Sequence, residues 1–129
     1  MAVDKAVRIL IVDDYKTMLR IVRNLLKQSG FDNVDEATDG ATALKMLRNG
    51  DYGLVISDWN MESMSGLALL RELRNDVRLK DVPFIMVTAE GKRDHVLAAK
   101  QAGVDNYIVK PFNAATLEAK IKSVLGASS

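Results

Sequence analysis

The chain has 129 residues, the usual size of one domain, and 48% of them are hydrophobic while 27% are charged, which excludes a disordered chain. Its 18 basic and 17 acidic residues leave a net charge of +1, which argues against nucleic-acid binding by bulk positive charge and gives no reason to expect binding to a membrane surface. Cysteine is absent, so disulfides, zinc–thiolate sites and thiol nucleophiles are excluded.

Short apolar runs alternate with segments of helical period along the chain. The runs cover residues 9–12, 34–37, 54–56, 84–87 and 107–109. Most of them lack polar alternation, which is typical of strands buried on both faces. Helices are predicted near residues 18–26, 40–48, 66–73, 96–103 and 117–125. Gly30 is predicted to end the first helix, Ser65 and Asn113 to cap the third and fifth, and residues 126–129 to fray.

This alternation predicts an α/β fold with an open, doubly wound, five-stranded parallel sheet. We expect one domain over residues 1–129, with a core from about 7 to 126. In such sheets, ligands bind beyond the carboxyl ends of the strands. The residues that follow each predicted strand are therefore the candidates for a functional site.

Polar side chains follow four of the five predicted strands. Asp13 and Asp14 follow the first, Asp58 the third, Thr88 the fourth and Lys110 the fifth. Three carboxylates at one edge repel one another unless a cation is present. Oxygen ligands, with a single histidine in the chain, favour Mg²⁺ or Mn²⁺ over zinc. A carboxylate nucleophile, a divalent cation and a lysine are the groups that phosphoryl transfer uses.

Several longer stretches resemble the receiver domains of two-component response regulators, and most of all the single-domain receivers of bacterial chemotaxis. The resemblance covers nearly the whole chain and is carried by Val12–Asp14, Met18–Leu26, Val55–Met61, Met86–Glu90, Ala102–Gly103 and Val109–Glu118. It implies a flavodoxin-like sheet with strand order 2-1-3-4-5 flanked by five helices.

The resemblance also implies roles for the residues at the strand ends. Asp58 is expected to accept the phosphoryl group and to share in binding Mg²⁺, with Mn²⁺ as a substitute. Asp14 is expected to bind the metal directly, Asp13 through water, and Asn60 through its backbone carbonyl. Lys110 is expected to pair with the phosphate.

Other residues are assigned to switching by the same resemblance. Thr88 is expected to donate a hydrogen bond to the phosphate, and Tyr107 to turn inward when Thr88 moves. Asn60 and Glu90 are expected to tune the rate of dephosphorylation. The expected output face, made by the fourth helix, the fifth strand and the fifth helix, has as its candidates Gly91, Tyr107, Val109 and Lys120.

The partners implied are a CheA-type histidine kinase as phosphodonor, the flagellar motor switch protein as target, and a phosphatase. The protein is expected to be a phosphoacceptor with intrinsic self-phosphorylation and autodephosphorylation, not an enzyme. We expect no membrane insertion, because no apolar run approaches the roughly 20 residues that span a bilayer. We expect a cytoplasmic protein that is a monomer. A receiver that drains the kinase without binding the motor, a phosphate sink, is the alternative, and the sequence leaves it open.

Three readings outside this family fit less well. A haloacid-dehalogenase-type phosphatase needs a D-x-D-x-T stretch after the first strand, where this chain has residues 13–17 as Asp-Asp-Tyr-Lys-Thr. A flavodoxin-type FMN carrier needs a phosphate-binding loop at the same place, where two aspartates would repel phosphate. In a transcriptional regulator we would expect a helix-turn-helix, and the segment after Lys110 has room for one helix.

One segment departs from the family pattern. Residues 61–66 read Met-Glu-Ser-Met-Ser-Gly where the family commonly has Met-Pro-x-Met-Asp-Gly. Glu62 adds negative charge near the expected metal site, so we hypothesise that it changes the affinity for Mg²⁺. The resemblance also implies a cis peptide bond between Lys110 and Pro111.

Overall fold

The structure, a computed structural model, describes residues 4–89 and 93–126 and contains one five-stranded parallel sheet. The strands are β1 (Ile9–Val12), β2 (Val34–Ala37), β3 (Leu54–Asp58), β4 (Phe84–Ala89) and β5 (Asn106–Lys110). Their order in the sheet is β2-β1-β3-β4-β5, with each neighbouring pair parallel. The predicted fold class and strand order are confirmed.

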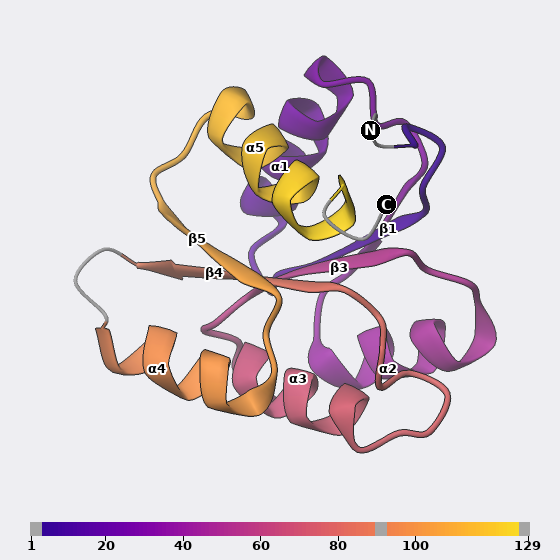
Figure 1. Cartoon of the computed structure of the whole chain (residues 1–129), viewed down its shortest axis with the longest axis vertical. Helices are drawn as coiled ribbons and strands as arrows, with labels where there is room; N and C mark the ends of the chain where they lie inside the picture. Colours follow the sequence, from indigo (N-terminus) through magenta and orange to yellow (C-terminus); the bar gives the residue numbers. More distant parts are fainter. Residues whose placement is uncertain (1–3, 90–92, 127–129) are drawn as a thin grey trace.

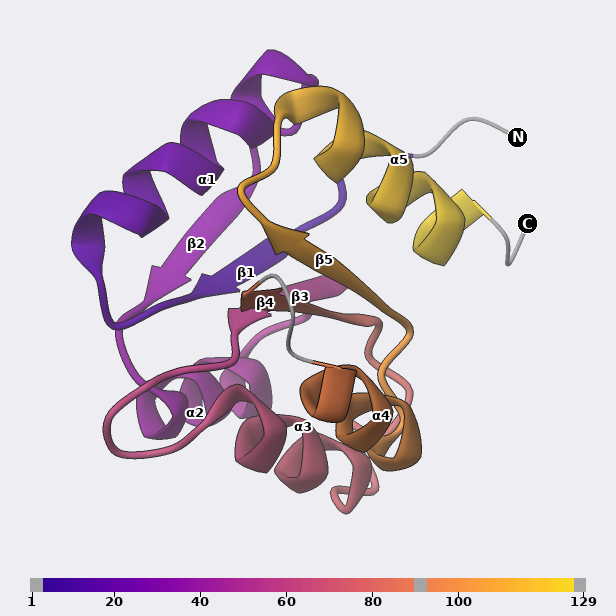
Figure 2. The same cartoon turned by 90° about the vertical axis from the view of Figure 1, so that its left-hand side faces the viewer.

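Five helices cover the two faces of this sheet. They are α1 (Lys16–Gln28), α2 (Gly40–Asn49), α3 (Gly66–Arg74), α4 (Arg93–Ala102) and α5 (Ala114–Leu125). Helices α1 and α5 lie side by side on one face, and α2, α3 and α4 form a row on the other (Figures 1 and 2). This arrangement gives three layers, as expected for right-handed βαβ crossovers in a parallel sheet.

The central strands bury apolar side chains on both faces, which explains why their sequences lack polar alternation. In β1, Ile9 and Ile11 pack under α1 and α5, whereas Leu10 and Val12 pack under the other three helices. All four are at most 2% exposed. Strand β2 lies at the sheet edge and is buried only at its two ends. The sheet therefore separates two apolar cores.

The ends of the helices follow capping chemistry. Ser65 accepts a hydrogen bond from the amide of Ala68, and Asn113 accepts one from the amide of Thr116, so both predicted caps are confirmed. Asp39, which the sequence analysis missed, caps α2 in the same way. Gly30 ends α1 with a φ of 90°, a conformation that side-chain-bearing residues rarely adopt.

Some boundaries differ from the sequence prediction. Helix α1 begins at Lys16, two residues before the first apolar residue of its stripe, because the polar first turn carries no periodic signal. Strand β4 continues to Ala89. The Lys110–Pro111 peptide bond is cis, as expected. Residues 127–129, predicted to fray, lie outside the described residues. Across the described part of the chain, no helix has the length and apolar character that a membrane span requires.

Candidate functional site

The residues predicted from the strand ends lie at the carboxyl edge of the sheet. Asp58 is the last residue of β3 and Lys110 the last of β5, while Thr88 is the last but one of β4. Asp13 directly follows β1. Asp13, Asp58 and Thr88 are buried, with exposures of 6%, 7% and 2%. Buried polar groups at one edge of a sheet, with a cation beside them, are typical of a functional site.

Lys110 forms an ion pair with Asp58. The Nζ atom of Lys110 lies 2.7 Å from Oδ1 of Asp58. The carboxylate side chain is 8% exposed, whereas the lysine side chain is 31% exposed. The pair is therefore anchored on a buried anion and reaches solvent on the side of the ammonium.

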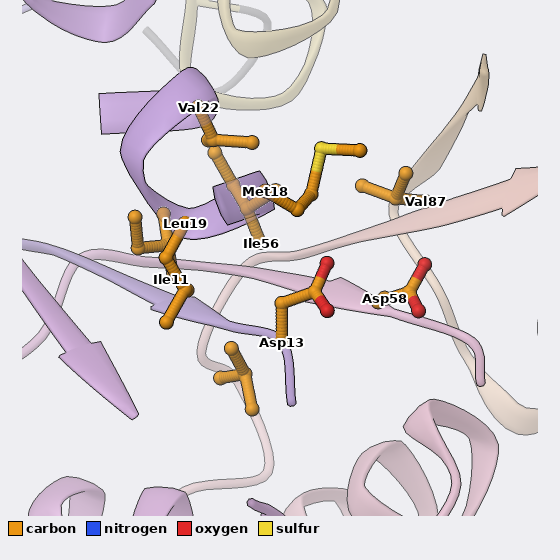
Figure 3. Close-up of a pocket in the computed structure, with 9 residues that line it drawn as sticks. Ile11, Asp13, Met18, Leu19, Val22, Ile56, Asp58 and Val87 are labelled. Atoms are coloured by element: carbon orange, nitrogen blue, oxygen red, sulfur yellow. The ribbon is translucent and has the colours of Figure 1, made fainter. Parts of the chain in front are cut away.

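Asp13 lies in a less favourable environment. The pKa of its carboxyl is raised to about 6, and burial is the largest cause. The nearby charge of Asp58 also raises this pKa, whereas a hydrogen bond from the amide of Tyr15 lowers it. A cavity of about 10 Å³, room for about one water, lies beneath the two carboxylates and is walled mainly by apolar side chains of α1 and the strands (Figure 3). Two carboxylates thus share one ammonium at the edge of an apolar core.

Asp14 lies apart from this pair. It is exposed, and its Oδ2 accepts a hydrogen bond from the amide of Glu62 at 3.0 Å. Together with Asn60 and other residues of the segment after β3, it lines an open hollow of about 390 Å³. The donor set, carboxylate and carbonyl oxygens with an excess of negative charge, fits a hard divalent cation. Within residues 4–89 and 93–126, no three acidic or histidine side chains stand close enough to hold a metal ion together as they are placed.

The segment after Asp58 is fixed by backbone contacts. The amide of Trp59 donates a hydrogen bond to the carbonyl of Val87, and the carbonyl of Trp59 accepts one from the amide of Gly66, each at 2.9 Å. A Cβ atom on Gly66 would overlap the carbonyl oxygen of Asp58 and would come within 2.7 Å of Sδ of Met86. Glycine at this position therefore allows α3 to begin directly against the end of β3.

Sequence reasoning missed one contact at the site. The imidazole of His95 in α4 stacks on the indole of Trp59, with ring centroids 4.1 Å apart and an angle of 6° between the planes. Its Nδ1 lies 3.3 Å from Oγ1 of Thr88. The sequence shows only a lone histidine seven residues after a threonine, which carries no chemical signal of its own. The contact depends on how α4 packs, which a pattern does not reveal.

Three of the four residues predicted for the output face lie on β5 and α5. Tyr107, Val109 and Lys120 are all partly exposed, and the ammonium of Lys120 lies 5.0 Å from the centre of the Tyr107 ring. Val109 is the register partner of Thr88 in the sheet. Glu90 and Gly91, the other predicted residues, lie outside the described residues.

Comparisons with known proteins agree with this geometry. The family model of the response regulator receiver domain matches residues 9–122. The chain is 54% identical to chemotaxis protein CheY-3 of Vibrio cholerae over 121 residues, 94% of this chain and 93% of the relative. It is 54% identical to chemotaxis protein CheY of Pseudomonas aeruginosa over 117 residues, 91% of this chain and 94% of the relative.

Solved structures show the same likeness. The chemotaxis protein CheY4 of Vibrio cholerae superposes with a TM-score of 0.86 at 31% identity, covering 93% of this chain and 99% of that one. The signal receiver domain of a histidine kinase from Syntrophus aciditrophicus superposes with a TM-score of 0.85 at 30% identity, covering 95% and 92%.

Proposed function

This chain belongs to the response regulator receiver domain family and is a chemotaxis receiver of the CheY type, and from that premise we propose that it accepts a phosphoryl group on Asp58 from a CheA-type histidine kinase. The observation that carries this proposal is the buried carboxylate of Asp58 with the ammonium of Lys110 at 2.7 Å. An ion pair that is open on one side provides a nucleophile and a positive charge in the same place.

The transfer follows from this geometry. A carboxylate oxygen of Asp58 attacks phosphorus, and an O–P bond forms as the N–P bond of the donor's phosphohistidine breaks. The imidazole nitrogen of the donor keeps the electron pair. Lys110 pairs with the transferring group, and the hydroxyl of Thr88 donates a hydrogen bond to it once its side chain turns towards Asp58. Carboxylates of Asp13 and Asp14 and the carbonyl of Asn60 would hold Mg²⁺, which supplies positive charge to offset that of the phosphoryl oxygens.

The same site accounts for switching. A phosphoryl group on Asp58 adds negative charge and strong acceptor oxygens. Thr88 gains a partner in one conformation more than in the other, which shifts a two-state equilibrium towards the active form. Val109 is the register partner of Thr88, so the change reaches β5 directly. We place the output on the α4–β5–α5 face, with Tyr107, Val109, Lys120 and Gly91, which is outside the described residues.

The proposed target is the flagellar motor switch protein. The chemotaxis names of two relatives at 54% identity support a role in chemotaxis. A phosphate sink fits the same names, so the binding experiment below separates the two. In this proposal the chain is a stoichiometric phosphoacceptor that phosphorylates itself from small phosphodonors and loses the phosphate to water, with Asn60 and Glu90 tuning that loss and a separate phosphatase accelerating it.

The acceptor site is tested with Trp59, the only tryptophan of the chain. Its fluorescence is followed while Mg²⁺ and then beryllofluoride, a phosphoryl mimic, are added. The wild type should respond saturably to both, and Asp58→Asn should lose the beryllofluoride response. The matched control is Asp32→Asn, an exposed aspartate away from the site, which should behave as the wild type. A wild type without any response would overturn the proposal.

The output is tested separately with purified motor switch protein. Beryllofluoride-activated wild type should bind it more tightly than the unactivated protein. Lys120→Ala should weaken that binding and leave the beryllofluoride response at Trp59 intact. Activated protein that receives phosphate from the kinase and yet does not bind the motor switch would establish the phosphate sink instead.

A further inference from the structure

The side chain of His95, on α4, contacts residues at the ends of two neighbouring strands of the site. It contacts Thr88 on β4 through Nδ1 and Trp59, the residue after Asp58, through its ring face. His95 and Trp59 are both half-buried, so the stack closes over the edge of the site without sealing it. Among residues 4–89 and 93–126, His95 is the one side chain that forms a hydrogen bond with the Thr88 hydroxyl.

A threonine hydroxyl has one proton to donate and accepts through its oxygen. When Nδ1 of His95 carries no proton, Thr88 donates to it, and that proton is then not available to a phosphoryl oxygen. When Nδ1 carries the proton, His95 donates to Oγ1 and holds the Thr88 side chain towards α4. In either tautomer, His95 favours the orientation of Thr88 that the structure shows.

We propose that His95 is a positioning residue that competes with the phosphoryl group on Asp58 for the hydroxyl of Thr88, and that it thereby sets how readily the protein is activated. The inference rests on the proposed function, because the competition exists only if Asp58 takes a phosphoryl group. His95 holds Thr88 in the resting state, and activation breaks this contact.

Because His95 stacks on Trp59, the fluorescence of Trp59 can report the loss of the contact between His95 and Thr88. The backbone of Trp59 is held on both sides, by the carbonyl of Val87 and the amide of Gly66. Its indole ring is therefore the part of the residue that can respond when His95 moves. Release of Thr88 changes the position of the imidazole, and the fluorescence of Trp59 reports that change together with the occupancy of Asp58.

The test is a double-mutant cycle on beryllofluoride affinity, measured by Trp59 fluorescence in saturating Mg²⁺. His95→Phe keeps a flat ring over Trp59 and removes the hydrogen bond. We expect it to raise the affinity by about 2- to 10-fold, the value of one neutral hydrogen bond. His95→Leu, which removes ring and hydrogen bond together, should raise it as well. The matched control is Gln101→Ala, an exposed neutral position on α4, which should leave the affinity unchanged.

The second arm of the cycle uses Thr88→Val, which keeps the shape of the side chain and removes the hydroxyl. In that background, His95→Phe should have no further effect, because the group competed for is gone. Thermal unfolding confirms that each variant is folded.

Two results would overturn the inference while leaving the proposed function in place: an unchanged affinity in both His95 variants, or the same gain with and without the Thr88 hydroxyl. A wild type that does not bind beryllofluoride in an Asp58-dependent way would overturn the proposed function, and the inference with it.

Discussion

The ammonium of Lys110 lies 2.7 Å from a carboxylate oxygen of Asp58, although the strands that end in these residues are separated by β4. The lysine side chain therefore reaches past the end of β4, where Thr88 lies. Its one positive charge serves an edge with two buried carboxylates, those of Asp13 and Asp58. This edge has a charge imbalance that favours the binding of a further cation.

Removing the ammonium should destabilise the fold. In Lys110→Met, two buried carboxylates lose the ammonium beside them. We expect the free energy of unfolding to fall by about 1–3 kcal/mol. This is less than for a fully buried ion pair, because the lysine side chain is partly exposed to solvent. In the Asp58→Asn background the loss should be smaller. Urea unfolding in EDTA measures both. Lys100→Met, an exposed lysine on α4, is the control, and an equal loss in the two backgrounds would show that the pair does not contribute.

A side chain at Gly66 should disturb the site around Asp58. Because a Cβ there overlaps the carbonyl oxygen of Asp58, Gly66→Ala has to push the start of α3 away from β3. We expect a loss of about 1–3 kcal/mol in stability, typical of an overpacked site, together with weaker binding of beryllofluoride. Chemical unfolding and Trp59 fluorescence check the two effects. Ser63→Ala, at an exposed position in the same loop, should change neither.

The charge of Glu62 should increase the affinity for Mg²⁺. Glu62→Gln removes this exposed charge and keeps the backbone amide that donates to Asp14, so we expect binding to weaken by about 2- to 5-fold at low salt and by less at high salt. Titration of Trp59 fluorescence with Mg²⁺ measures it. Glu62→Pro is not a matched change, because it also deletes the amide donor. Equal affinities of wild type and Glu62→Gln at every salt concentration would disprove the effect.

The pair of Tyr52 and Asp35, which lies away from the candidate site, should make the stability of the fold depend on pH. The hydroxyl of Tyr52 donates to Oδ2 of Asp35 at 2.7 Å. This hydrogen bond is the main cause that holds the pKa of Asp35 below its usual value, and the contact with Arg8 lowers it further. Burial is the main cause that raises the pKa of Tyr52 to about 12, and the hydrogen bond to Asp35 contributes to the same shift. Tyr52→Phe should therefore lower stability by about 0.5–1.5 kcal/mol at neutral pH.

The sign of each shift fixes the pH range of this loss. A lowered carboxyl pKa stabilises the fold above the unfolded value, and that stability disappears as acid protonates Asp35. A raised tyrosine pKa stabilises the fold below about 10, and that stability disappears as pH rises towards about 12. The difference between wild type and Tyr52→Phe should shrink at both extremes. Tyr15→Phe, at a side chain 62% exposed, should show no such profile.

Much of this structure could be predicted from particular residues. The unbroken apolar runs such as Ile9–Val12 indicated strands buried on two faces, and that is how β1 packs. Residues placed at strand ends, such as Asp58 and Lys110, meet because all strands of a parallel sheet end at one edge. The resemblance supplied their roles, and the strand order came from it as well.

The parts that were not predicted depend on side-chain packing. No pattern in the sequence predicts that Asp14 is exposed and bonded to the amide of Glu62 while Asp13 is buried. The stack of His95 on Trp59 depends on how α4 lies against the loop after β3. Periodicity predicts which face of a helix is apolar. It does not predict which polar side chains of different helices and strands contact one another.

The division of the apolar core by the sheet has an evolutionary consequence. The residues beneath α1 and α5 and those beneath α2, α3 and α4 belong to separate clusters. Compensating substitutions can therefore accumulate on one side without repacking the other. The layer of α2, α3 and α4 can therefore be remodelled by substitution while the layer of α1 and α5 keeps its own packing.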